Sequence, residues 1–215
     1  METYDNWIDG GYVASPNDLR MATTTPFTGE VWAEVADDPA AVDVAVKAAR
    51  AAFEGEWGTM PAAERGRLMR KLGELLTRDA EMLGQVESRD NGKIIRETGA
   101  QAKGLQSYYD FFAGQADKIS GEKLPNPASN FLVYTEKVPV GVVGAIIPWN
   151  SPLSLLTWKL APLLAAGCTA VVKPSDITPV TALLLAERAT EAGFPAGVIN
   201  IVTGGGEVGA AISAH

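Results

Sequence analysis

The sequence predicts an α/β protein with a Rossmann-like parallel sheet and flanking helices. Two patterns indicate this fold. From residue 141 onward, short apolar segments alternate with longer helical ones at the spacing of right-handed βαβ units. Between residues 37 and 118, apolar side chains recur every three or four positions, as on surface helices. With 47% hydrophobic residues, a chain of 215 residues can bury a sizeable core.

Residues 1–118 are predicted to form a mainly helical amino-terminal part. One helix start lies at Asp37-Asp38-Pro39, and a second at Thr59-Met60-Pro61 precedes a leucine-rich stretch. A third helix is expected from Asp79 to Asn91-Gly92, because this dipeptide often forms a left-handed helix end. An approximate helical phase then continues to about residue 118. The aromatic cluster at 108–112 is interpreted as core packing in preference to an aromatic binding box.

Residues 140–215 are predicted to form a βαβαβα unit. The segment 121–130 is rich in proline, asparagine, serine and glycine, so a turn and a boundary are expected there, followed by a strand at 131–138. The elements expected after it are strands at 141–147, 169–173 and 198–202, and helices at about 153–166, 178–192 and from 206. The first of these strands is apolar on both faces, as is typical of a buried parallel strand.

Charge and composition exclude several classes of protein. With 26 acidic and 18 basic residues the net charge is −8, so no binding of nucleic acid or of an anionic membrane is expected. The single cysteine, Cys168, excludes an internal disulfide and a multi-cysteine metal site, and no metal is predicted. Prolines interrupt the uncharged stretch 138–158, which argues against a membrane span. The amino terminus does not resemble an export signal, so a cytoplasmic location is expected.

Three strand ends carry the residues that predict a ligand site. Open parallel sheets bind ligands in the crevice at the carboxyl ends of their strands. The first strand leads into Pro148-Trp149-Asn150, the second into 173–176 (Lys-Pro-Ser-Asp) and the third into Thr203 and three glycines. An amide, an ammonium beside a carboxylate, and a glycine turn at a helix start together predict a nucleotide site.

The glycine turn leaves two interpretations open. Gly204, Gly206 and Gly209 have the spacing G-x-G-x-x-G, which permits a tight turn and a close approach to phosphate. This turn follows a third strand, whereas the usual dinucleotide motif follows the first. It is therefore either a phosphate site or a helix start that needs only small residues. Lys173 is a stronger candidate, because it ends an apolar strand and lies near Asp176.

Taken together, these strand ends resemble the aldehyde dehydrogenase superfamily. The matching stretches are V-P-V-G-V-V-G-A-I-I-P-W-N-S-P-L, L-A-A-G-C-T-A-V-V-K-P-S-D and E-A-G-F-P-A-G-V-I-N-I-V-T-G, in the family's order between Val138 and Gly204. D-N-G-K at 90–93 and P-F-T-G-E at 26–30 are also similar to the family. The resemblance covers essentially the whole chain. It implies NAD(P)-dependent oxidation of a small-molecule aldehyde to a carboxylic acid.

The resemblance also implies roles for individual residues. Asn150 would donate its side-chain amide to the oxyanion that forms when a thiolate attacks the aldehyde; the alternative is a loop asparagine that caps the following segment. Lys173 would donate hydrogen bonds to the hydroxyl groups of the adenosine ribose. Asp176 stands where the family more commonly has glutamate, so the choice between NAD and NADP stays open. The glycine turn also has one residue fewer than is usual in the family. The implied cofactor-binding set is Ile146, Ile147, Pro148, Trp149, Lys173, Ser175, Asp176, Gly206 and Gly209.

The family's cysteine nucleophile and its general-base glutamate belong to motifs downstream of His215. Cys168 is interpreted as a buried core residue. We therefore expect a truncated, incomplete aldehyde dehydrogenase fold that is inactive alone and leaves a strand edge uncovered; the alternative is a stand-alone nucleotide-binding or regulatory module that acts with a partner subunit. Residues 119–139 correspond to the family's oligomerisation β-hairpin, so a homo-oligomer, dimer or tetramer, is expected, unless the hairpin packs on its own domain.

Overall fold

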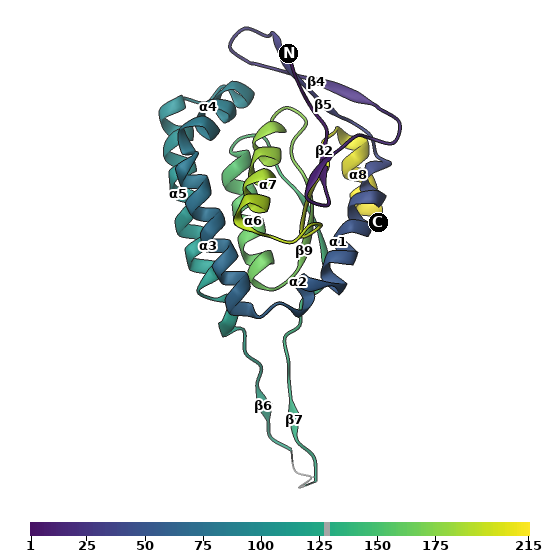
Figure 1. Cartoon of the computed structure of the whole chain (residues 1–215), viewed down its shortest axis with the longest axis vertical. Helices are drawn as coiled ribbons and strands as arrows, with labels where there is room; N and C mark the ends of the chain where they lie inside the picture. The colour runs from purple at the N-terminus through teal and green to yellow at the C-terminus, as the bar shows by residue number, and fades with distance from the viewer. Residues whose placement is uncertain (127–129) are drawn as a thin grey trace.

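The computed structural model describes residues 1–126 and 130–215, and its centre is a five-stranded sheet. Three parallel strands form one side of it: β8 (Val142–Ile146), β9 (Thr169–Lys173) and β10 (Ile199–Ile201). The strand order is β3-β2-β10-β9-β8, with helices on both faces (Figure 1). The predicted Rossmann-like α/β class is confirmed. β8 lies at one edge of this sheet, as the incomplete fold implies.

The amino-terminal residues differ from the prediction, because residues 2–36 form strands. β2 (Asn6–Ile8) and β3 (Gly11–Val13) make a hairpin that pairs antiparallel with β10 and extends the central sheet. β1 (Glu2–Tyr4), β4 (Arg20–Thr24) and β5 (Val31–Ala36) form a second sheet. A mainly helical part over 1–118 is therefore wrong for its first third. β1, β2 and β3 have three residues each, too short to show a period, and β2 also pairs with the distant β10.

The predicted helices begin and end close to the expected positions. α4 ends at Asn91, and Gly92 has a φ of 74°, the left-handed conformation expected there. α3, α4 and α5 form an outer layer that packs on α6 and α7 (Figure 1). The helices before the hairpin are α1 (Ala41–Glu54), α2 (Glu56–Thr59), α3 (Ala62–Arg78), α4 (Ala80–Asn91), α5 (Ile95–Ala113) and the 3-10 turn η1 (Ala116–Lys118).

Helices that follow the parallel strands cover both faces of the sheet. α6 (Pro152–Ala165) and α7 (Val180–Ala192) lie on one face, and α8 (Gly206–Ala214) lies with α1 on the other. The main core lies between the sheet, α6, α7 and the outer helices, and a smaller core lies under α1 and α8. Each face buries apolar side chains, so the sheet is stabilised from both sides. None of the described helices is long and apolar enough to cross a membrane.

The sequence assigns Cys168 and the aromatic cluster at 108–112 to the core, and the packing tests both assignments. Trp57 is fully buried, and its indole N–H donates to the carbonyl oxygens of Gly167 and Cys168. The Cys168 side chain is buried, as expected. The aromatic cluster at 108–112 is divided: Tyr109 is fully buried, whereas Tyr108 and Phe111 are exposed. Phe112 is partly buried and packs against the main core. The core interpretation is therefore correct for Tyr109 and Phe112 but not for Tyr108 and Phe111.

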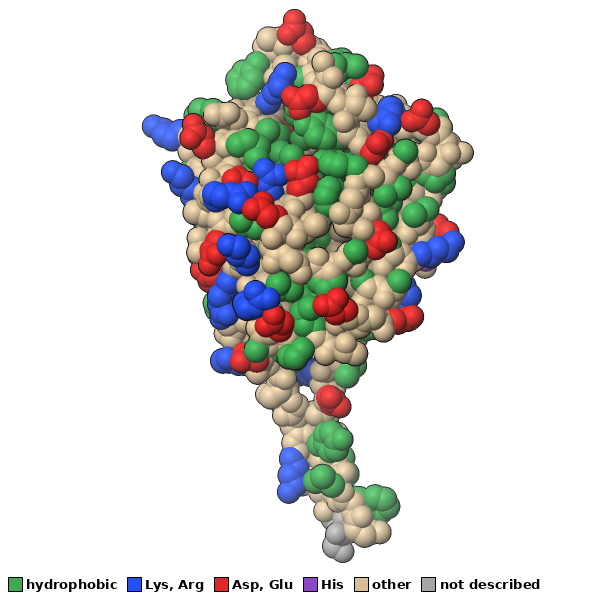
Figure 2. Space-filling model, viewed as in Figure 1, with side chains coloured by type: hydrophobic (Ala, Val, Ile, Leu, Met, Phe, Trp, Pro, Cys, Tyr) green, Lys and Arg blue, Asp and Glu red, His purple; other side chains and the backbone are tan. Residues whose placement is uncertain are grey.

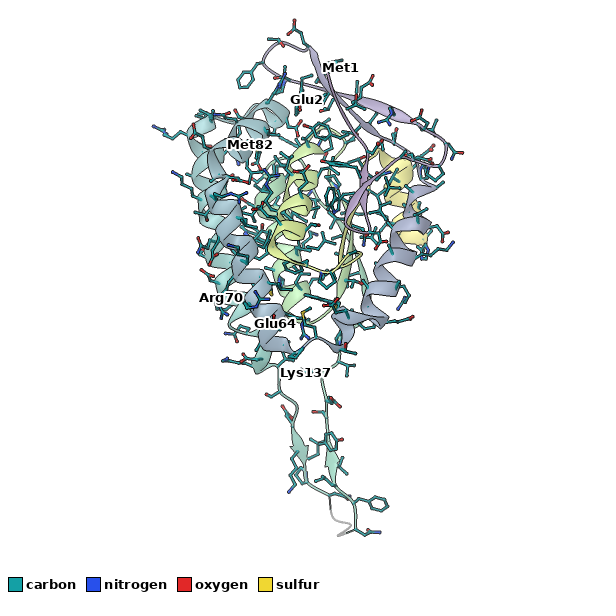
Figure 3. The ribbon with its side chains drawn as sticks, in the orientation of Figure 1. Met1, Glu2, Glu64, Arg70, Met82 and Lys137 are labelled. Atoms are coloured by element: carbon teal, nitrogen blue, oxygen red, sulfur yellow. The ribbon has the colours of Figure 1, made fainter. Side chains whose placement is uncertain are left out.

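The segment 119–139 projects from the body as a thin hairpin (Figures 1 and 2). β6 (Lys123–Leu124) pairs antiparallel with β7 (Val133–Tyr134), and Lys137 lies where the hairpin joins the body (Figure 3). Part of the predicted turn, residues 127–129, lies outside the described residues. The predicted strand at 131–138 is shortened to two residues. Among the described residues of 119–139, all but Asn126 and Pro139 are exposed, so this part of the hairpin does not pack on its own domain.

Candidate functional site

The ends of β8 and β9 lie side by side at one edge of the sheet. Ile147 N–H donates to the Lys173 carbonyl oxygen over 2.9 Å, just beyond the paired strands. On the other side of β9, Val202 N–H donates to the Val172 carbonyl oxygen over 2.8 Å. These bonds hold the first residues after each strand in register. The segments that carry the predicted ligand residues therefore begin at the same edge, as parallel pairing requires.

Lys173 joins two of these segments. Its side chain is buried, and Nζ donates to the carbonyl oxygens of Gly204, at 2.6 Å, and Pro174, at 2.8 Å. Burial lowers the pKa of the ammonium, while the nearby carboxylates of Asp176 and Asp37 act in the opposite direction. An ammonium group has three donors, and its two bonds to described residues leave one for a ligand.

The glycine turn contains one position that requires glycine. Gly204 has a φ of +137°, and a Cβ there would lie 2.5 Å from Val208 and 2.7 Å from Asp37 Oδ1. At Gly209, a Cβ would lie 3.5 Å from the Lys173 side chain, so this glycine packs beside the lysine. A Cβ at Gly206 would meet nothing within 4 Å, so the surface at the start of α8 is open there.

Asp37 occupies the start of α8. Its Oδ1 accepts the backbone N–H of Gly205 over 2.8 Å, although the two residues are 168 positions apart. A carboxylate at a helix amino terminus is favourable, but it would repel a phosphate at the same place. Of the two interpretations of the glycine turn, this contact favours the helix start. The sequence marked Asp37 only as a helix signal for α1, and no local pattern linked it to the glycines.

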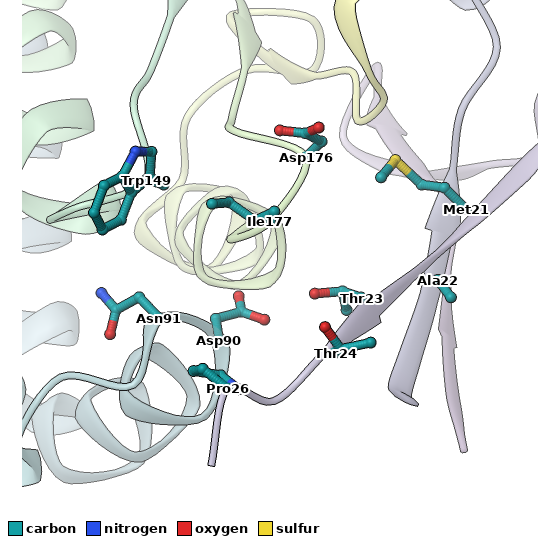
Figure 4. A pocket seen from close by; sticks show the side chains of 10 residues that line it. All are labelled: Met21, Ala22, Thr23, Thr24, Pro26, Asp90, Asn91, Trp149, Asp176 and Ile177. Carbon is teal, nitrogen blue, oxygen red and sulfur yellow. The ribbon is translucent and has the colours of Figure 1, made fainter. Parts of the chain in front are cut away.

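The segment after Lys173 faces a pocket of about 320 Å³. Ser175 Oγ donates to Asp176 Oδ1 over 3.1 Å, and the Asp176 side chain is exposed. Asp176 and Ile177 come from the β9–α7 loop, and Trp149 faces them from the β8–α6 loop (Figure 4). The remaining lining residues are Met21, Ala22, Thr23, Thr24, Pro26, Asp90 and Asn91.

The end of β8 and the residues that follow it, as far as Trp149, are exposed except at Ile147. Ile146 and Trp149 are about half exposed, and Pro148 is exposed, so all three can contact a ligand. The Ile147 side chain is only 2% exposed and packs in the main core. Successive residues of a strand point to opposite faces, which places Ile146 and Ile147 on different sides. A cofactor could therefore meet Ile147 only through its backbone.

Asn150 lies in different surroundings from Lys173. Its exposed side chain lines a second pocket, of about 370 Å³, together with Gln101, Tyr108, Ser151 and Trp158. The Tyr108 and Trp158 rings are 5.9 Å apart. The structure thus brings Lys173, Gly209 and Ile146 together. Asn150, four residues after Ile146, lines the separate aromatic pocket.

Two buried acids of α4 support both loops, and the sequence did not indicate them. Asp90 Oδ2 accepts the N–H of Val180, the first residue of α7, over 3.2 Å. Glu87 Oε2 accepts the N–H of Leu153, in the first turn of α6, over 3.3 Å. Burial raises the pKa of both carboxyls, that of Asp90 to about 7. In the sequence, Asp90 belongs to the D-N-G-K motif, which indicates the family but no role for this side chain.

The fold and this edge define a class: open α/β proteins with a mixed central sheet, whose three parallel strands place the candidate ligand residues at their carboxyl ends. A sequence model of the aldehyde dehydrogenase family matches residues 12–215. The chain therefore belongs to the aldehyde dehydrogenase family.

Individual relatives agree with this assignment. The chain is 45% identical to mouse cytosolic aldehyde dehydrogenase 1 in an alignment of 218 positions that covers 97% of this chain and 42% of the relative. An aldehyde dehydrogenase of Enchytraeus buchholzi is 46% identical, with 97% and 43% covered. The structure of a Bacillus cereus aldehyde dehydrogenase in complex with NAD+ superposes with a TM-score of 0.96 at 42% identity, covering 100% of this chain and 44% of that one. The chain thus spans less than half the length of these relatives.

Proposed function

We propose that this chain binds the adenosine part of NAD at the carboxyl edge of the sheet and supplies an oxyanion donor for NAD-dependent aldehyde oxidation. The observation that carries the proposal is Lys173, a buried ammonium between β9 and the glycine turn with one donor left for a ligand. The open surface at Gly206 leaves room beside it for a flat group. A bound nicotinamide cofactor would accept the hydride removed from the substrate.

The remaining residues have supporting roles in this proposal. Ile146, Pro148 and Trp149 provide apolar contacts on one side of the cofactor, and Ile147 contributes only its backbone. Gly209 keeps the Lys173 side chain close to α8. Because Asp37 already accepts the Gly205 N–H, the glycine turn contacts the adenosine and does not bind the pyrophosphate. Ser175 orients the Asp176 carboxylate toward the ribose.

Two carboxylates near Lys173 favour NAD over NADP. Asp176 and Asp37 both act electrostatically on the Lys173 ammonium, so one positive charge faces two negative ones. A 2′-phosphate placed there would be repelled, whereas a ribose hydroxyl could donate to a carboxylate. The Bacillus cereus relative in complex with NAD+ supports NAD as a dinucleotide for this fold.

Isothermal titration of the 215-residue chain tests this proposal. We expect NAD+ to bind and NADP+ to bind at least about tenfold more weakly, a difference of about 1.4 kcal/mol. Asp176→Asn should narrow the difference by improving NADP+ binding, because one repelling charge is removed. A folded chain that binds neither dinucleotide contradicts the proposed function. Equal affinity for the two contradicts only the assigned role of the carboxylates.

Asn150 is the residue that would act on the substrate. An uncharged amide can donate a hydrogen bond to a developing oxyanion without losing a proton, a contribution of about 3 to 4 kcal/mol in comparable sites. The single thiol of the chain, Cys168, is buried and so is not a candidate nucleophile. The 215 residues alone are therefore not expected to oxidise aldehydes. An assay of reduced nicotinamide absorbance over a panel of aldehydes would detect any turnover.

The projecting hairpin is the proposed contact with a second copy of the chain. It carries a row of exposed apolar side chains, among them Phe131, Leu132 and Tyr134, each more than 60% exposed. Apolar surface of this kind on a thin hairpin is unfavourable in water unless another surface covers it. A dimer or tetramer would cover it.

A cytoplasmic location is also part of the proposal. A relative described as cytosolic and the unpaired Cys168 support it.

Replacing Phe131 and Leu132 with serine is expected to convert the oligomer into a monomer. The change removes two large apolar side chains from the hairpin and leaves the body of the molecule untouched. Light scattering coupled to size-exclusion chromatography measures the mass. The matched control is Phe27→Ser, an equally exposed phenylalanine in the β4–β5 turn, which should leave the mass unchanged. An unchanged mass in the hairpin variant would exclude this surface as the interface.

A further inference from the structure

We propose that Lys93 and Glu87 are positioning residues for Asn150, and that they act as two tethers on the first turn of α6. Lys93 Nζ donates to Ser151 Oγ over 2.6 Å, and Glu87 Oε2 accepts the Leu153 N–H over 3.3 Å. These two contacts lie on either side of Pro152, directly after Asn150. The inference rests on the proposed role of Asn150 as oxyanion donor, but the tethering can be tested separately.

The start of α6 needs these tethers because it does not cap itself. Ser151 occupies the N-cap position, where a serine hydroxyl usually accepts an N–H of the first turn. Here it makes no such bond, and its hydroxyl accepts from Lys93. Pro152 has no N–H to offer. The acceptor for Leu153 comes from Glu87, on another helix. The position of the turn is thus set by α4.

Lys93 is itself held in place on several sides. Its carbonyl oxygen accepts from Ser88 Oγ at 2.6 Å, and its N–H donates to Asn91 Oδ1 at 2.9 Å. Its ammonium also donates to Gln101 Oε1 at 2.9 Å. Gln101 belongs to α5 and lines the same pocket as Asn150. Lys93 therefore connects the end of α4, the first turns of α5 and the turn that carries Asn150.

The second tether, Glu87, is buried and interacts electrostatically with Lys93, the first tether. The Glu87 side chain is 2% exposed, and burial raises its pKa. The Leu153 N–H and the charge of Lys93 oppose that rise, so they favour the carboxylate that accepts the bond. An oxyanion donor is effective only when it is oriented before the reaction, and small misplacements reduce the rate strongly. Asn150, whose side chain is exposed, depends on its backbone for that orientation.

Relaxation of backbone ¹⁵N in the 215-residue chain tests the tethering. In the wild type, we expect the backbone of Asn150 and Ser151 to have order parameters of about 0.85, which is typical of rigid backbone. In Lys93→Met, we expect the order parameters of both residues to fall below about 0.6. Lys93→Arg keeps a donor and should restore the order. Lys103→Met changes an exposed lysine of α5 and should have no effect. Unchanged order at Asn150 in folded Lys93→Met would overturn the proposal.

Further variants distinguish local loosening at Asn150 from a general loss of folding. Ser151→Ala removes only the acceptor of the first tether, and it should loosen Asn150 as much as Lys93→Met does. The double variant should loosen it no further, whereas additive losses would overturn the coupling. Glu87→Gln keeps an acceptor for Leu153 and should preserve order that Glu87→Met loses. Because these measurements need no cofactor, their outcome is independent of whether the chain binds NAD.

Discussion

Replacing Asp90 with asparagine is expected to remove a loss of stability that the wild type suffers as the pH rises from about 4 to about 8. Asp90 is buried, and burial raises its pKa from the ordinary 3.8 to about 7 in the folded chain. Between these values the folded chain binds more protons than the unfolded chain, so the free energy of unfolding falls as the pH rises. The full difference corresponds to on the order of 4 kcal/mol.

The measurement is urea unfolding of both proteins at several pH values across this range. The quantity to compare is the free energy of unfolding of the wild type minus that of Asp90→Asn. It should become more negative between pH 4 and pH 8 and level off above. An amide oxygen can still accept the Val180 N–H, so the start of α7 keeps its cap. Asp110→Asn, at an exposed position of α5, serves as the control. Parallel curves for wild type and Asp90→Asn would show that the Asp90 carboxyl is not perturbed.

Replacing Lys173 with methionine is expected to weaken NAD+ binding by about ten- to a hundredfold. Methionine fills much of the same space but removes every donor, including the one left for a ribose hydroxyl. A hydrogen bond from a charged group contributes about 1.5 to 3 kcal/mol, which corresponds to that range of affinity. Titration calorimetry measures the effect, and thermal unfolding confirms that the variant is folded at the temperature used.

The variant also loses the contacts of Nζ with the Gly204 and Pro174 carbonyl oxygens, so some loss of stability is expected as well. Lys159→Met is the matched control, because this lysine is exposed on α6. It should change neither quantity. A folded Lys173→Met variant that binds NAD+ within twofold of the wild type would remove Lys173 from the proposed site.

Parts of the fold with a strong local pattern were predicted closely from the sequence. The strand Thr169–Lys173 was predicted with its observed bounds, and α4 ends at the asparagine before the predicted glycine. Continuous apolar runs and left-handed glycine ends are local signals, so a single sequence contains them. The strands within residues 2–36 were not predicted. Three of them have only three residues, too short to show a period. Most pair with one another, but β2 also pairs with β10 across more than 190 residues.

The candidate site was predicted only in part, for a similar reason. The sequence placed Asn150, Lys173 and the glycines at strand ends, and the structure agrees that they follow parallel strands. It could not show that Asp37 accepts the Gly205 N–H, that Glu87 and Asp90 cap two helices, or that Ile147 points into the core. Each of these facts depends on how separate layers pack against one another.

The sequence by itself therefore determined the alternation of strands and helices, the family, and the residue types at the edge of the sheet. Those properties follow from periodicity, turn chemistry and motif order, which act over a few residues. Only the tertiary structure decided which carboxylate meets which helix start and which side chains share a pocket. One such contact joins residues that are 168 positions apart. These contacts arise when apolar faces are buried and each enclosed polar group must find a partner, a condition that no local pattern records.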